Sequence, residues 1–145
     1  MRFTKPMSVI DNQSGNIMVL FCCLMPVFLA FMGIVMDFAW IMHNEMLLDE
    51  ATQAAGDSII LALDIGQSSA LGLAVLDQDK AEEMATSYLQ KNVETAQVVA
   101  CEFPNPNEMT LNTKVVIPTV FLRLFDMETV EVTSKTFSKV TYTGG

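Results

Sequence analysis

The residues that could do chemistry are few and stand far apart. Cys22 and Cys23 lie side by side inside a long apolar run, Cys101 stands far along the chain, and His43 is the single histidine. A disulfide framework needs paired cysteines in the folded part of the chain, and a zinc site needs several ligands close together. We therefore interpret Cys101 as a small buried hydrophobe in a strand and predict neither nucleophilic nor metal chemistry.

The carboxylates give no stronger signal of catalysis. Pairs such as Asp49-Glu50 and Glu82-Glu83 fall on predicted water-facing sides of helices, and the sequence has no glycine-rich phosphate loop. The net charge of −9, with a pI near 4.3, argues against a nucleic-acid partner, which would need a basic surface. We expect a protein that is not an enzyme, with no cofactor and no small-molecule substrate.

The dominant element is the uncharged run Ile17–Met36, twenty residues long. At 1.5 Å per helical residue it covers about 30 Å, the thickness of the hydrocarbon core of a bilayer. We predict a cytoplasmic segment at residues 1–14, a transmembrane helix at 15–43 and an extracytoplasmic α+β domain at 44–145. A cleavable signal peptide, with Ala30 as a weak cleavage context, is the alternative for this run.

Charge and aromatic placement suggest how this helix sits in the bilayer. Arg2 and Lys5 precede the apolar run and Asp37 follows it at once, so the positive-inside rule places the N-terminus in the cytoplasm. Trp40 and His43 fall where the helix should leave the lipid. We expect both at the membrane interface, with His43 solvated.

The helical pattern continues beyond the run to about Leu63. One apolar stripe recurs at steps of three and four, and it consists of Leu48, Ala51, Ala55, Ile59 and Ala62. Glu45, Asp49, Gln53 and Asp57 form a polar stripe at steps of four. The alanines leave little bulk, so another helix or a sheet can lie close against this face.

A connection and a second helix should follow. Residues 66–77 show no convincing period and are interpreted as a connection with a short apolar patch. Asp79 and Glu82 resemble a capping box, which predicts a helix that ends near Asn92.

Beyond this helix the apolar period changes to two. Residues 96–103, 109–117 and 130–142 are predicted strands, with a turn at 104–107, and strands in meander order pair antiparallel. The fold class is therefore α+β: a long N-terminal helix, a second short helix and a small antiparallel sheet of about three strands. The apolar stripe of the long helix is the expected cover of that sheet.

The apolar segment 118–125 between the last two predicted strands has two interpretations. It is a short helix, capped by Thr119, whose Phe121, Leu124 and Phe125 pack under the sheet, or the three side chains form a contact patch for the membrane surface or a partner. We favour the core interpretation.

The order of these segments resembles that of a bacterial family. Residues 12–17 running into the apolar span, then 33–39, 48–57 and the segment 116–125 resemble TadE/TadG-like proteins of Tad (tight adherence, Flp) pilus systems. The resemblance implies a pilin-like α+β fold and a minor pilin or pseudopilin in the bacterial inner membrane. Such a protein assembles or anchors an adhesive pilus through contacts with other pilus-assembly proteins or pilins, as a homo- or hetero-oligomer.

The resemblance also implies a processing site, because pilin precursors are cut after a glycine and Gly15 before Asn16 occupies the corresponding place. Cleaved members usually carry glutamate five residues into the mature helix, where this chain has Leu20. We therefore favour an uncleaved, TadG-like anchor. The alternative function is a single-pass membrane-tethered adaptor or sensor domain unrelated to pili.

Overall fold

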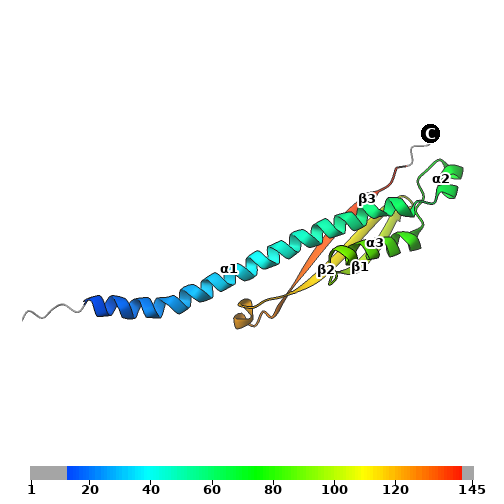
Figure 1. Ribbon diagram of the computed structural model, residues 1–145. Coiled ribbons are helices and arrows are strands. Elements are labelled where there is room, and N and C mark those ends of the chain that lie inside the picture. Colours follow the sequence, from blue (N-terminus) through cyan, green and yellow to red (C-terminus); the bar gives the residue numbers. More distant parts are fainter. Residues whose placement is uncertain (1–12, 142–145) are drawn as a thin grey trace, which may run out of the picture.

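Helix α1 (Gln13–Asp57) organises the molecule in the computed structural model, which describes residues 13–141 (Figure 1). The remaining elements are η1 (Ser58–Ala62), α2 (Ile65–Leu71), α3 (Gln78–Asn92), β1 (Gln97–Asn105), β2 (Glu108–Pro118), η2 (Leu122–Phe125) and β3 (Thr129–Lys139). The prediction of an α+β fold with a long N-terminal helix and a three-stranded antiparallel sheet is confirmed.

The N-terminal part of α1 projects away from the sheet (Figure 1). Its side chains from Ile17 to Leu29 are exposed. Among the described residues, this helix is the candidate single membrane span by length and composition. The helix continues through Pro26, whose missing N–H costs one backbone hydrogen bond. Figure 1 shows a gentle change of direction within this part of α1.

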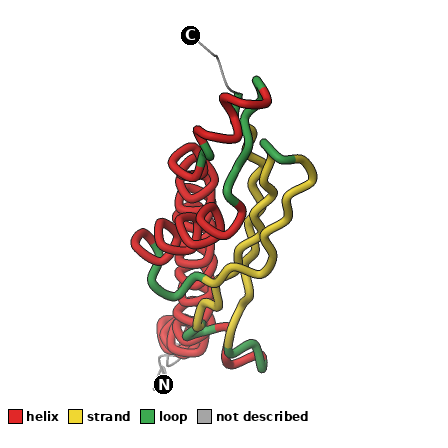
Figure 2. The backbone as a smooth tube through the Cα atoms, turned by 90° about the vertical axis from the view of Figure 1, so that its right-hand side faces the viewer, coloured by secondary structure: helices red, strands yellow, loops and turns green. Residues whose placement is uncertain are grey.

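The C-terminal half of α1 lies along the sheet. Helices α1 and α3 form one layer against one sheet face (Figure 2). The face of α1 that is turned inward is buried and carries Leu48, Ala51, Ala55 and, in η1, Ile59 and Ala62. Small residues allow a close approach: a Cβ atom on Gly56 would lie 2.5 Å from Ser138 Oγ on β3.

The sheet has the order β1-β2-β3, with β2 central. Alternate residues of β2 point into the helical layer and are buried: Met109, Leu111, Thr113, Val115 and Ile117. The one polar side chain of this row, Thr113, shares a hydrogen bond with Thr52 of α1, with 2.6 Å between the two hydroxyl oxygens. This pairing satisfies both hydroxyls inside the core.

The segment between α1 and α3 differs from prediction. Residues 66–77 are not a plain connection, because α2 forms there. The Asp64 carboxylate accepts a hydrogen bond from the Gln67 N–H, and Gly72, with φ of 65°, ends the helix in the left-handed conformation. The predicted cap of α3 was also wrong: Asp77, two residues before Asp79, accepts the capping bond.

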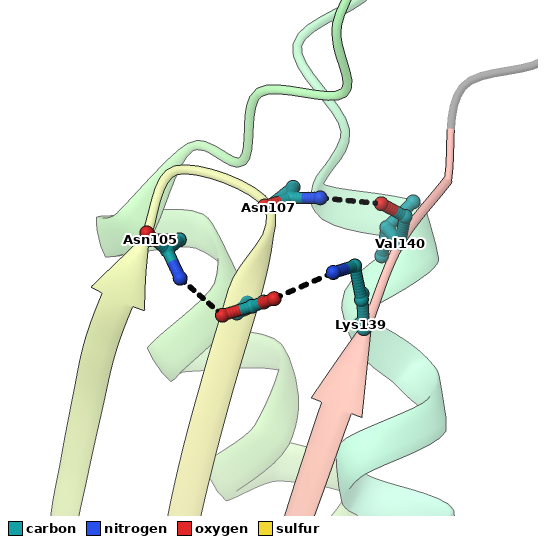
Figure 3. Close-up of polar contacts among 5 residues, drawn as sticks. Asn105, Asn107, Lys139 and Val140 are labelled. Carbon is teal, nitrogen blue, oxygen red and sulfur yellow. Dashed lines mark hydrogen bonds and ion pairs between the residues drawn. The ribbon is translucent and has the colours of Figure 1, made fainter.

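The end of the sheet farthest from the free half of α1 is held by polar contacts (Figure 3). The Glu108 carboxylate accepts hydrogen bonds from the Asn105 amide and from Lys139 Nζ, the latter at 2.8 Å. Asn107 Nδ2 donates to the Val140 carbonyl at 3.2 Å. The hydrogen bond from Lys139, which has the larger effect, and the one from Asn105 hold the pKa of the Glu108 carboxyl below its ordinary value.

Candidate functional site

The most unusual contact joins the middle of α1 to the connection between β2 and β3. The Asp37 carboxylate accepts hydrogen bonds from three consecutive backbone N–H groups, at 2.6 Å from Phe121, 2.7 Å from Leu122 and 3.2 Å from Val120. Asp37 is 6% exposed. A residue at the edge of the candidate membrane span therefore binds backbone more than eighty positions later in the chain.

The connection supplies these donors because of its own local structure. The first N–H groups of any helix lack intrahelical acceptors, and η2 has no side-chain cap from its own preceding residue, Phe121. The Asp37 carboxylate, which belongs to α1, provides the missing acceptor for these N–H groups. In the part of the chain that is described, none of the three ion pairs includes Asp37, so the partners of its carboxylate are backbone N–H groups.

A glycine one turn earlier in α1 completes the contact. Gly33 is buried, and the Phe121 ring lies directly over its Cα, in the space that a Cβ atom would occupy. Gly33 and Asp37 are four residues apart and therefore share one face of the helix. The glycine admits the ring while the aspartate binds the backbone beside it.

The connection, which we define as residues 119–128, also closes on itself. The Thr119 N–H donates to the Glu128 carbonyl at 3.0 Å, and the Thr119 hydroxyl donates to the Met127 carbonyl. Asp126, with φ of 61°, turns the chain back after η2. The connection is thus a short closed loop that is attached to α1 through Asp37 and Gly33.

The core interpretation of segment 118–125 was wrong, because none of the three residues packs under the sheet. Leu124 and Phe125 are 75% and 61% exposed, and Phe121 packs on Gly33 of α1. The buried side chain is Leu122. Thr119 does not cap a helix, since its hydroxyl binds the far side of the loop.

The packed face of α1 is longer than the stripe predicted from sequence. It extends at steps of three and four from Gly33 through Asp37, Ile41 and the half-buried Asn44 to Leu48, where the predicted stripe begins. All five stripe residues, Leu48, Ala51, Ala55, Ile59 and Ala62, belong to the hydrophobic core under the sheet and α3. Their own domain occupies that face, so they are not free to receive a separate partner.

The other predicted positions also belong to α1. Trp40, which is 54% exposed, and His43 lie just beyond Asp37, with ring centroids 6.1 Å apart. Gly15 and Asn16 fall in the first turn of α1. The structure does not bring these two pairs together, since about 24 residues of helix separate them.

Cys101 lies on β1 opposite Leu111 and packs against the core. Burial first, and then the negative charge of Glu82, raise the pKa of its thiol to about 11. The thiol is therefore protonated at neutral pH. Across residues 13–141 no three His, Cys, Asp or Glu side chains are grouped as a metal site.

The sequence did not lead us to predict that Gly33 and Asp37 together bind the connection between β2 and β3. A usable signal was present: an acidic residue directly after a long apolar run, four positions from a glycine and in phase with the stripe that begins at Leu48. What the sequence lacks is any mark on the distant backbone that would receive the carboxylate.

Comparisons with protein-family models, with curated proteins and with solved structures found no match for this chain.

Proposed function

We propose that this protein is a membrane-anchored, pilin-like accessory component of a Tad/Flp-type pilus assembly system. In this role it acts through protein-protein contacts in the bacterial inner membrane. The observation that carries the proposal is the division of one continuous helix. Its N-terminal half is apolar and exposed, and its C-terminal half is the spine of a small α+β domain. A helix of this kind can both anchor in lipid and present a domain at a set distance from it.

The charge distribution supports an orientation with the N-terminus in the cytoplasm. Arg2 and Lys5 precede the apolar run, and all the acidic residues except Asp11 follow it. The folded domain would then face the periplasm or the cell exterior. Its acidic character suits contacts with protein partners better than with nucleic acid.

Contacts with assembly partners would come from the free part of α1. The exposed side chains of the apolar run, such as Phe21 and Phe28, have no cover within the described chain. Packing of one transmembrane helix beside another would bury them. The stripe at 48–62 would contribute only indirectly, by fixing the domain to the helix.

The proposal includes retention of the intact N-terminus. Leu20 stands where cleaved pilins carry a glutamate that pairs with the amine of a neighbouring subunit, and an unpaired amine in lipid would cost several kcal/mol. Intact-mass spectrometry of the protein from native membranes should give the uncut chain. A mature form that begins at Asn16 would contradict this part of the proposal.

The function is tested by deleting the gene in its native bacterium and complementing it with site-specific photo-cross-linker variants. We expect the deletion to reduce surface pili and adherence, and a photo-cross-linker at Phe28 to capture pilins or membrane proteins of the assembly machinery. The same cross-linker at Leu73 is the matched control, because Leu73 is 68% exposed but lies in the α2–α3 segment, far from the apolar run (Figure 1).

Normal pili in the deletion strain would overturn the proposal. So would products at Phe28 that contain only proteins unrelated to pili, which would favour a membrane-tethered adaptor or sensor instead.

A further inference from the structure

We propose that the connection 119–128 inserts its exposed apolar side chains into the lipid interface, so that the domain touches the membrane at a second place beside the span. The proposed occupant of this surface is lipid. The inference rests on the membrane anchorage in the proposed function and adds a partner for a surface that the fold leaves uncovered.

The position of the connection along α1 is the first step. The Phe121 ring covers Gly33, which lies inside the apolar run, three residues before its last residue, Met36. Asp37 binds the connection one residue beyond that end. At 1.5 Å per residue, the contact therefore spans the last turn of the run, about 5 Å, and places the connection at the depth where the run ends.

Tilt of the helix changes this depth little. A packed element lies roughly 8–10 Å from the helix axis. A typical tilt of about 20° then moves it by about 3 Å along the membrane normal. This is smaller than the 5–10 Å that interfacial segments commonly bury in the boundary between headgroups and acyl chains.

The composition of the connection suits that boundary. Four large apolar side chains are open to the surroundings: Val120, Leu124, Phe125 and Met127. Val120 and Leu124 are 71% and 75% exposed, although Leu122 between them is buried in the protein. The α1 residues at the same level, Val35, Met36 and Phe38, are exposed as well, so the helix and the connection both present apolar side chains at the depth where the run ends.

Charge does not drive the contact. Arg123 is paired with Glu128 at 3.3 Å between Nε and Oε1, and Asp126 leaves the connection with a net negative charge. Attraction to anionic headgroups would need an excess of basic residues. The binding therefore comes from apolar burial and should not depend on anionic lipid.

The test uses tryptophan as a depth probe in the full-length protein, reconstituted into two sets of phosphatidylcholine vesicles. In one set the acyl chains are brominated near the headgroup, and in the other they are brominated near the chain end, where bromine can reach Phe28 inside the run. Trp40 is the only tryptophan, so a Trp40→Phe background is dark. Leu124→Trp reports on the connection, Phe28→Trp on the span and Leu73→Trp on a distant exposed site. With bromine near the headgroup, Leu124→Trp should lose roughly half of its emission, since interfacial insertion reaches about 5–10 Å. Leu73→Trp should lose little.

Two outcomes would overturn the inference while leaving the anchorage intact. In both, Phe28→Trp is quenched. In the first, Leu124→Trp is quenched no more than Leu73→Trp; in the second, its emission is blue-shifted but not quenched, which means burial against protein such as a second copy. If Phe28→Trp is also unquenched, the anchorage itself fails and this inference fails with it. Added anionic lipid should leave the quenching of Leu124→Trp unchanged, and a steep increase would contradict the apolar mode of binding.

Discussion

Replacing Asp37 by alanine should release the connection 119–128 from α1 without unfolding the domain. The carboxylate accepts hydrogen bonds from three backbone N–H groups, and within the described chain these groups donate to no other acceptor. On α1 the fully buried core residues begin at Leu48, about 16 Å farther along the helix, so most of the core under the sheet lies away from this contact.

The magnitude follows from the chemistry of the contact. A hydrogen bond to a charged group contributes about 1.5–3 kcal/mol when its partner is otherwise unsatisfied. In Asp37→Ala, water that enters the space left by the carboxylate would replace part of three such bonds, so we expect a net loss of about 3 kcal/mol in the free energy of local opening. Since 1.4 kcal/mol is a factor of ten, amide exchange in this segment should accelerate about 100-fold.

Hydrogen-deuterium exchange with mass spectrometry on the protein in nanodiscs measures this directly. Peptides that cover Val120, Phe121 and Leu122 should lose protection, whereas peptides from β2 should not change. Asp49→Ala is the matched control, since it removes an exposed carboxylate from the same helix. In Asp37→Asn the exchange rate at 120–122 should lie between those of the wild type and Asp37→Ala, because asparagine keeps one acceptor oxygen but loses the charge. Unchanged exchange at 120–122 in Asp37→Ala would refute the assigned role of the carboxylate.

Three further predictions concern the domain. Two hydrogen bonds lower the pKa of the Glu108 carboxyl, so they stabilise the fold above its ordinary pKa of 4.5, and this stabilisation is lost as the pH falls below that value. Glu108→Gln should therefore flatten the acid side of a plot of unfolding free energy against pH, and a plot of unchanged shape would contradict this. Alkylation of Cys101, with Cys22 and Cys23 replaced by serine, should rise about ten-fold per pH unit between pH 7 and 9, since thiolate is the reactive form; a plateau in that range would show a lower pKa. Thr52→Val should lower the free energy of unfolding, measured with denaturant, by about 1–3 kcal/mol, because it leaves the Thr113 hydroxyl with only the weaker bond to the Ser134 carbonyl. The double variant with Thr113→Val should be closer to wild type in stability, and additive losses in the double variant would rule out the buried pair.

The sequence predicted those features that depend on a regular period. The change from a helical period to a period of two located three strands within a few residues of their observed bounds, and the stripe from Leu48 to Ala62 identified the buried face of the long helix. Both signals arise because one face of each element must be apolar wherever a core is built against it.

The sequence did not predict features that depend on a few local or distant contacts. Helix α2 has one buried side chain, Ser68, so it leaves no apolar period, and its two ends are set by Asp64 and Gly72. The segment after Pro118 was assigned to the core because it is apolar. The structure instead anchors it by backbone donors to Asp37, which leaves Leu124 and Phe125 exposed.

The position of Asp37 links these observations. A carboxylate directly after a twenty-residue apolar run lies where loss of hydration is costly, and three N–H donors lower that cost. The donors belong to the folded domain, so the carboxylate at the end of the apolar run keeps its hydrogen-bond partners only while the connection is bound. Near the other end of the helix, Gly56 brings the backbone against Ser138 of β3. With contacts at both places, the domain cannot swing about α1, and a partner that binds the exposed part of the helix would hold the domain in one fixed orientation.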